Sequence, residues 1–182
     1  MLKKILLAGC LLGLTTVAQA EIRPIIEVGI ESGGDFLVKT TAEDMNAGGG
    51  FYLGAGVDLV TGDSDDVFYR IMVGYLFDTI DFIGGDASTN AVPIHLGVFK
   101  RFDRHEGGIG LAYYMGPTYE VCMSWCSTYD FDNAIGFYAQ YNYHFGNGAY
   151  LGGKYTSVEY SGAAGLGTID ASSLGIYLGA SF

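Results

Sequence analysis

The sequence predicts an all-β protein, specifically an eight-stranded antiparallel up-and-down transmembrane β-barrel. Three observations support this fold class: eight segments alternate apolar residues with glycine or polar residues, the connectors between them are alternately short and long, and the chain begins with an export signal. Alternation with period two is typical of a strand whose two faces meet different environments. A membrane-spanning helix is not predicted, because the chain has no uninterrupted apolar run of about 18 residues.

The composition is that of a folded protein and excludes two other classes. Of the 182 residues, 49% are hydrophobic, and such a chain is too apolar to be intrinsically disordered. Its length suggests a single domain. The chain has 9 Lys and Arg against 20 Asp and Glu, which gives a net charge of −11. Binding to nucleic acid needs a basic face that neutralises phosphates, so no nucleic-acid partner is expected.

The N-terminal segment, residues 1–20, is interpreted as a secretory signal peptide. Lys3 and Lys4 form a basic region, residues 5–17 are largely apolar, and residues 18–20 read Ala-Gln-Ala, a signal-peptidase cleavage site. Cleavage there leaves residues 21–182 as the barrel domain. A lipoprotein signal with a lipidated Cys10 is the alternative, but the apolar run before Cys10 is shorter than the roughly 7–15 residues of an ordinary signal peptide.

Four strand segments follow this leader. In residues 22–31, isoleucine and valine occupy one face, while arginine, glutamate and glycine occupy the other. Residues 51–60 alternate apolar side chains with tyrosine, glycine and aspartate. Residues 67–77 set valine, isoleucine and aromatic residues against phenylalanine, arginine, methionine and glycine, and residues 92–99 set aliphatic residues against proline, histidine, glycine and phenylalanine. Each segment predicts a strand with one aliphatic face.

Four further segments complete the predicted barrel. Residues 109–121 and 131–145 place glycine, tyrosine and polar residues opposite aliphatic and aromatic ones. Residues 150–160 are the least regular, and a bulge near Ser157 is expected to shift their phase. Residues 174–182 return to strict alternation and end on an aromatic residue. An even number of strands closes the sheet without a free edge, which lipid would not tolerate.

The aliphatic faces of these segments are expected to face lipid. Aromatic residues gather near the segment ends, and two aromatic girdles around an aliphatic band are typical of a transmembrane barrel. A soluble β-sandwich is the alternative, but the polar outer face that it requires is missing. The two predicted girdles consist of Phe51, Tyr75, Phe77, Tyr113 and Tyr160, and of Tyr69, Tyr141, Tyr143, Phe145 and Phe182.

The connectors predict the orientation of the barrel. With Glu21 placed in the periplasm, both termini and the short turns are periplasmic, and the long loops are extracellular. The short turns are residues 61–66, 102–108 and 146–149, and the long loops are residues 32–50, 78–91, 122–130 and 161–173.

The export signal, the eight alternating segments and the terminal Phe182 resemble the small outer-membrane barrels of Gram-negative bacteria, of the OmpA transmembrane-domain and OmpX type. The resemblance implies residence in the bacterial outer membrane as a monomer without a cofactor. It also implies contact with outer-membrane lipid and lipopolysaccharide, and insertion by the barrel assembly machinery. Phe182 resembles the assembly signal of that family, although Ala180 stands where the family often has tyrosine.

Inward-facing charges predict an ion-pair network inside the barrel, because an isolated buried charge costs several kcal/mol. Its functional alternative is an ion path, which would make the protein a small-solute channel. An eight-stranded barrel is only wide enough for side chains to fill, and inward aromatic residues such as Tyr52 and Tyr138 are expected to plug it. The predicted network consists of Glu27, Glu31, Asp58, Arg70, Glu120, Asp132 and Lys154.

Neither a catalytic site nor a metal site is predicted. The alternative is a lipid A-modifying enzyme of similar size. Such enzymes need a histidine with serine and a carboxylate at the outer rim. His95, His105 and His144 do not fall at that level. The carboxylates of residues 63–66 are interpreted as a solvated turn rather than a calcium site, because the later glutamate of an EF-hand loop is missing. Acids in the long loops are interpreted as solubilising, with cation bridging to lipopolysaccharide as the alternative.

Cys122 and Cys126 are expected to form a disulfide in an exported chain. Trp125, the only tryptophan, lies between them, and Phe36 and Leu37 add apolar side chains to the first long loop. Tryptophan is enriched where proteins bind partners, and insertion of Trp125 into the lipid interface is the alternative. The sequence therefore predicts a non-enzymatic barrel with a role in envelope integrity, whose surface loops bind or adhere to a host or surface protein or to lipopolysaccharide.

Overall fold

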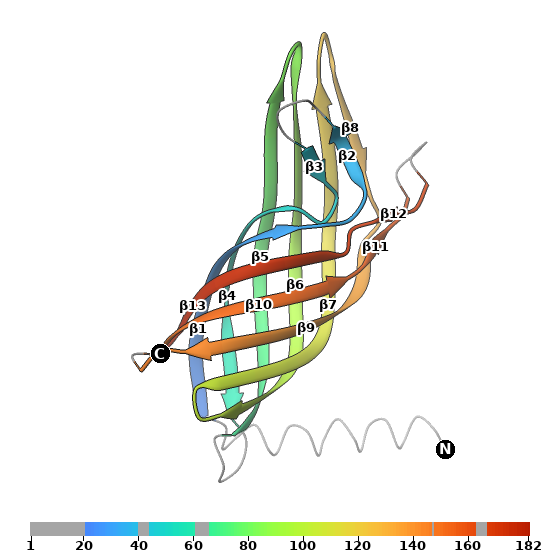
Figure 1. Ribbon diagram of the computed structural model, residues 1–182. Coiled ribbons are helices and arrows are strands. Elements are labelled where there is room, and N and C mark those ends of the chain that lie inside the picture. Colours follow the sequence, from blue (N-terminus) through green and yellow to red (C-terminus); the bar gives the residue numbers. More distant parts are fainter. Residues whose placement is uncertain (1–20, 40–43, 61–65, 147, 163–166) are drawn as a thin grey trace, which may run out of the picture.

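The computed structural model describes residues 21–39, 44–60, 66–146, 148–162 and 167–182, and the predicted signal peptide, Cys10 and residues 63–65 lie outside these ranges. Within them the chain forms strands and no helix (Figure 1). No helix in this part of the chain is long and apolar enough to cross a membrane. The strands that form the barrel wall are β1 (Glu21–Ser32), β4 (Gly50–Val60), β5 (Val67–Phe82), β6 (Gly85–Phe102), β7 (His105–Cys122), β9 (Ala134–His144), β10 (Ala149–Ser157) and β13 (Ser173–Ser181).

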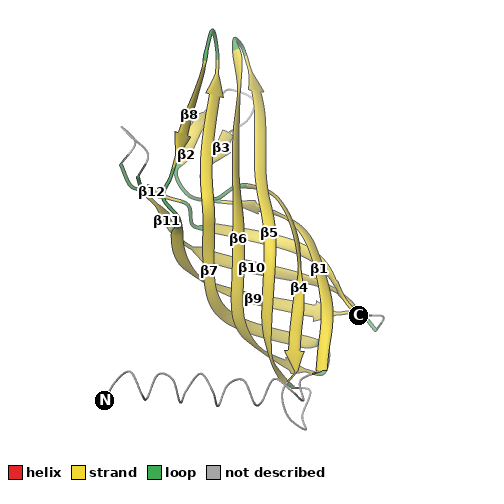
Figure 2. Cartoon of the chain, turned by 180° about the vertical axis from the view of Figure 1, so that it is seen from behind, coloured by secondary structure: helices red, strands yellow, loops and turns green. Residues whose placement is uncertain are grey.

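These strands close into one antiparallel barrel, which confirms the predicted fold class. Each strand pairs with its neighbours along the chain, and β1 pairs with β13 to close the wall. The closing register aligns Ile26 with Ala180 and Ser32 with Leu174. Figure 2 shows the wall from behind, with the strands inclined to one another around the lumen. Closure leaves every wall strand paired on both sides along the barrel, as a lipid environment requires.

The two faces of the wall differ as the alternation predicts. Outward positions are aliphatic or aromatic and exposed, as Ile30 and Leu178 are, whereas inward positions carry the buried charges and tyrosines. Two inward glycines show why small residues alternate with large ones in the lumen. The Tyr52 ring lies over Gly54 and Gly74 on adjacent strands, and a Cβ at either position would overlap that ring. The glycines therefore make room for the aromatic filling of the barrel.

One aromatic residue of the predicted girdles lies inside instead. Tyr160, in the short strand β11 (Glu159–Tyr160), is buried against Tyr114 and Phe131. The alternation of β10 continues without a phase shift through Val158, which is also buried. The phase shift expected near Ser157 does not occur, so the prediction that Tyr160 faces outward was wrong.

Two of the predicted long loops are paired strands. β5 and β6 stay paired beyond the barrel until Phe82 meets Gly85, and β7 pairs with β8 (Cys126–Asp130) until Cys122 meets Cys126. Because β6 and β7 also remain paired there, the two hairpins form one sheet that rises from one end of the barrel (Figure 1). We call this end the hairpin end, and the opposite end the turn end.

The first long loop covers the inner face of this sheet. β2 (Phe36–Lys39) and β3 (Asp44–Asn46) form a small hairpin beside the tall ones, and β12 (Ile169–Asp170) pairs with β11 nearby (Figure 1). Met45 is fully buried in the apolar cluster that includes Ile80, Ala87 and Tyr119. The inner side chains of the hairpins are apolar and pack into this cluster. In the sequence, the polar and small residues between them obscure this pattern.

Candidate functional site

The lumen contains a charge network centred on Arg70. Its guanidinium Nε and Nη2 donate to the two carboxylate oxygens of Asp58 at 2.7 and 2.9 Å. Nη2 also lies 3.0 Å from Oε1 of Glu106, and Nη1 lies 3.9 Å from Oε1 of Glu27. All four side chains are buried. Asp58 and Arg70 are directly opposite each other on β4 and β5, so the strand register itself forms the two-point contact.

Glu106 is a second centre of this network, and it is absent from the network that the sequence predicts. Its carboxylate accepts hydrogen bonds from Asn142 at 2.7 Å and from Arg101 at 2.7 Å, and Nε2 of His144 lies 2.8 Å away. The sequence predicts a turn over residues 102–108, but β7 begins at His105. The even-numbered inward positions of that strand, extended back from Gly110, would have identified Glu106 as inward-facing.

Two glutamates of β1 are held by uncharged donors. Glu27 accepts from Gln140 and from the Tyr150 hydroxyl, both at 2.7 Å. Glu31 accepts from Ser173 at 2.6 Å and from the Tyr177 hydroxyl. These bonds satisfy carboxylates that would otherwise be costly to bury.

Lys154 belongs to the Glu31 side of the lumen. Its Nζ lies 3.8 Å from Oε1 of Glu31. It also sits over the rings of Tyr52 and Tyr177, 4.3 and 4.2 Å from their centroids. The aromatic faces and the carboxylate together stabilise a fully buried ammonium group.

Two residues of the predicted network lie outside it. Between Met115 and Thr118, β7 gains one residue relative to β6, where Val92 pairs with Met115 and Asn90 with Thr118. Gly116, with φ of 53°, occupies this bulge. The bulge reverses the inward parity of β7, so Tyr119 is buried and Glu120 faces outward on the hairpin sheet. The prediction for Glu120 was therefore wrong.

The placement of Asp132 was also wrong. This residue is exposed between β8 and β9, where its backbone N–H donates to the carbonyl of Ser161. The sequence predicts one strand over residues 131–145, but β9 begins only at Ala134.

The three histidines occupy three separate environments. His95 is buried in mid-lumen between the rings of Tyr52 and Tyr138. His105 is exposed at the turn end and contacts the Tyr141 hydroxyl. His144 belongs to the Glu106 cluster. None of the three histidines therefore lies together with a serine and a carboxylate at the hairpin end.

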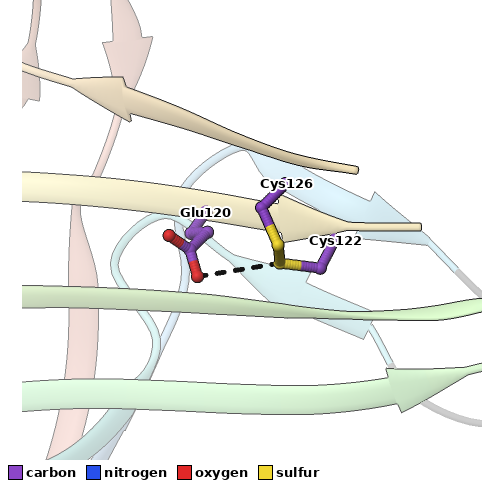
Figure 3. A group of neighbouring side chains, drawn as sticks. All are labelled: Glu120, Cys122 and Cys126. Carbon is purple, nitrogen blue, oxygen red and sulfur yellow. Dashed lines mark hydrogen bonds between the residues drawn. A yellow bond between two sulfur atoms is a disulfide. The ribbon is translucent and has the colours of Figure 1, made fainter. Parts of the chain in front are cut away.

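A disulfide connects the last paired positions of β7 and β8 (Figure 3). The Sγ atoms of Cys122 and Cys126 are 2.02 Å apart. Glu120 lies beside them: one carboxylate oxygen is 3.7 Å from Sγ of Cys122 and the other accepts from Thr128 at 3.0 Å. The carboxylate of Glu120 and the sulfurs of Cys122 and Cys126, all of them groups of the kind that bind metal ions, lie within 4.8 Å of one another. A disulfide sulfur carries neither a proton nor a thiolate charge, so the 3.7 Å approach is a close contact, and this oxidised group is not a metal site.

The tips of the two tall hairpins expose large apolar side chains. Ile83, in the β5–β6 turn, is fully exposed, and Met123 and Trp125, in the β7–β8 turn, are 69% and 78% exposed. Asp86 pairs with Cys122, so the two turns lie side by side. We call Ile83, Met123 and Trp125 the apolar tip.

The remaining loop residues have different roles. Phe36 is exposed and lies under Nζ of Lys39, whereas Leu37 packs against the apolar cluster beneath the hairpins. Asp35 connects the first loop to the last, because its carboxylate accepts from the N–H of Asp170 at 2.9 Å. Hydrogen bonds from Ser172 lower the pKa of the exposed Asp170 carboxyl. These contacts join the first long loop to the last one at the hairpin end.

Known proteins resemble this chain in fold rather than in sequence. No family model and no curated protein sequence matches the chain. The attachment invasion locus protein Ail of Yersinia pestis, solved in complex with the heparin analogue sucrose octasulfate, superposes with a TM-score of 0.56 at 10% identity, over 89% of this chain and 99% of Ail. Neisserial surface protein A superposes with a TM-score of 0.55 at 8% identity, over 88% of this chain and 96% of its own. The chain therefore has the fold of the small eight-stranded outer-membrane β-barrels.

Proposed function

We propose that this protein is a non-enzymatic barrel of the bacterial outer membrane that binds a partner at the cell surface through its hairpin end. The observation that carries the proposal is the apolar tip, three large apolar side chains that stand free of the barrel on two paired hairpins. Exposed apolar patches on rigid scaffolds are typical of interaction sites. The closed barrel with an apolar outer band supports residence in lipid and a contribution to envelope integrity.

The arrangement of the chain ends supports a defined orientation. β1 begins at the turn end and β13 ends there, and Asp103 and Arg104 connect β6 to β7 at the same end. Transmembrane barrels of bacteria have short periplasmic turns and longer extracellular segments. The hairpin end is therefore extracellular in this proposal, and both termini are periplasmic. Exposed Phe182 then presents a terminal aromatic residue to the barrel assembly machinery.

The filled lumen supports surface binding over conduction. Arg70, Tyr52, Tyr177, Phe68 and Phe99 are among its largest fully buried side chains. The rings of Phe68 and Phe99 are stacked 5.7 Å apart, and Arg70 sits 4.3 Å from the centroid of Phe99. A barrel of this size has little space beyond that occupied by its own side chains.

A trimming experiment tests the proposal. Residues 78–89 and 118–130 are each replaced by Asn-Gly, which joins Phe77 to Asn90 and Pro117 to Phe131; both pairs are already adjacent across the hairpins. The intact and trimmed barrels are compared for binding to lipopolysaccharide and to films of extracellular-matrix proteins. We expect the intact barrel to bind at least one of these surfaces, and trimming to abolish that binding while the heat-modifiable folded band on gels persists.

Two results would contradict this proposal. Binding that survives the removal of both hairpins would place the site elsewhere. A complete loss of binding in His95→Ala, with both hairpins intact, would point to a site in the lumen, because His95 is buried there.

A further inference from the structure

We infer that the surface bound by the hairpin end is a cationic protein segment, in which basic side chains flank an apolar one. This inference rests on the proposed function and specifies its partner. It is carried by the apolar tip together with the charge of the sheet beneath it. A sulfated polysaccharide, whose analogue occupies Ail, does not suit this surface.

The hairpins that carry the apolar tip are strictly acidic. Residues 78–91 and 117–133 contain six acids and no lysine or arginine. None of the ion pairs among the described residues involves an acid of either hairpin. The acids are Asp78, Asp81, Asp86, Glu120, Asp130 and Asp132.

Two of these acids lie in an unfavourable arrangement. Asp81 and Asp86 are directly opposite each other on β5 and β6, and both are exposed. Glu120 pairs with Ser88, two residues from Asp86 on β6, so all three belong to one neighbourhood of the outer sheet face. Like charges directly opposite each other destabilise a strand pair. A bound cationic side chain would relieve this repulsion, immediately below the apolar tip.

The geometry favours a protein segment over the other surfaces. Polyanions such as heparin and anionic lipid headgroups would be repelled by the hairpin acids. An apolar side chain of the partner would be buried against Ile83, Met123 and Trp125, which favours binding. A lysine or arginine next to it would pair with Asp81 and Asp86. The disulfide holds the turn that carries Met123 and Trp125, so little conformational entropy is lost on binding.

Trp125 provides the readout, because it is the only tryptophan in the chain. The full barrel is inserted into nanodiscs of zwitterionic lipid. Because the trimmed barrel lacks Trp125, its nanodiscs serve as the control for peptide binding to lipid in a parallel calorimetric titration. The probes are an octapeptide of alternating lysine and leucine, its glutamate–leucine and lysine–serine counterparts, and heparin. We expect the lysine–leucine peptide to shift Trp125 emission to shorter wavelength, and the other three probes to leave it unchanged.

Matched variants separate charge from apolar contact. Asp81→Asn combined with Asp86→Asn is expected to weaken peptide binding roughly tenfold, as expected when close charge pairs across an interface are removed. Asp103→Asn, which removes an exposed acid at the turn end, is expected to change nothing. Ile83→Ser combined with Met123→Ser keeps the tryptophan and is expected to weaken binding by a similar factor, whereas Phe36→Ser, at an exposed site outside the tip, is not.

Several results would overturn the inference. Binding of heparin or of the glutamate–leucine peptide instead would show that the partner is anionic, and peptide binding that disappears with a chelator and returns with calcium would show that the acids act through a metal ion. Peptide binding unchanged in the Asp81 and Asp86 variants would remove the charge argument. If trimming still abolishes binding to matrix films or lipopolysaccharide in any of these cases, the proposed function stands and only the cationic partner is wrong.

Discussion

Removing the Arg70 side chain should destabilise the folded barrel by about 3–5 kcal/mol, the cost of leaving a buried carboxylate unpaired. The contacts show where this cost arises. Glu106 keeps Arg101, Asn142 and His144, and Glu27 keeps Gln140 and Tyr150. Among the described residues, Asp58 has its ion pair and its side-chain hydrogen bonds with Arg70 alone.

The free energy of unfolding is measured by urea titration in lipid vesicles for the wild type, Arg70→Ala, Asp58→Asn and the double variant. Because the penalty comes from the stranded Asp58 charge, the double variant should be less destabilised than the sum of the two single variants by about 1–3 kcal/mol. Arg104→Ala, at an exposed turn residue, serves as the matched control and should be nearly neutral. A loss below about 1 kcal/mol in Arg70→Ala, or strictly additive effects, would refute this reasoning.

Three further outcomes are expected. Glu106→Gln should destabilise the barrel by about 2–4 kcal/mol in the same titration, because Arg70 and Arg101 both lose a charged partner. Asp132→Asn at the surface should change the free energy of unfolding by less than about 0.5 kcal/mol. Equal effects of the two substitutions would contradict the network. Replacing Cys122 and Cys126 by serine should weaken binding at the tip more than it lowers the free energy of unfolding, since the closed loop is short; free thiols found by mass spectrometry in protein taken directly from the membrane would show that the disulfide does not form there. The wild type should conduct only poorly in planar bilayers, and large, stable single-channel currents would show that the lumen is open.

The wall of the barrel was predictable because its signal is local. Alternation assigns Arg70 and Lys154 to the lumen and Ile30 to the outside, whatever the rest of the chain does. Closure then follows from the even number of strands and from the intolerance of lipid for a free edge.

The failures arise where pairing with a neighbouring strand overrides the local pattern. The bulge at Gly116 is a mismatch between β7 and β6, and neither strand alone reveals it, so Glu120 was assigned to the wrong face. The apolar residues on the inner side of the hairpins, among them Ile80, Ala87 and Tyr119, are buried together with Met45 of another loop, and the local pattern does not show this tertiary contact. Glu106 was missed because a strand was expected to begin later than it does.

The shape of the hairpin sheet has a consequence for how strongly one molecule can hold a partner. β5 continues for five residues after Phe77 leaves β4, which at the rise of a strand lifts the tip about 17 Å from the barrel rim. The sheet there is only four strands wide, about 14 Å from first to last. Such a narrow summit buries far less area than a stable protein–protein interface requires. Firm attachment would therefore come from many copies side by side in one membrane, each contributing a brief contact, so that surface density rather than single-site affinity sets the strength of the hold.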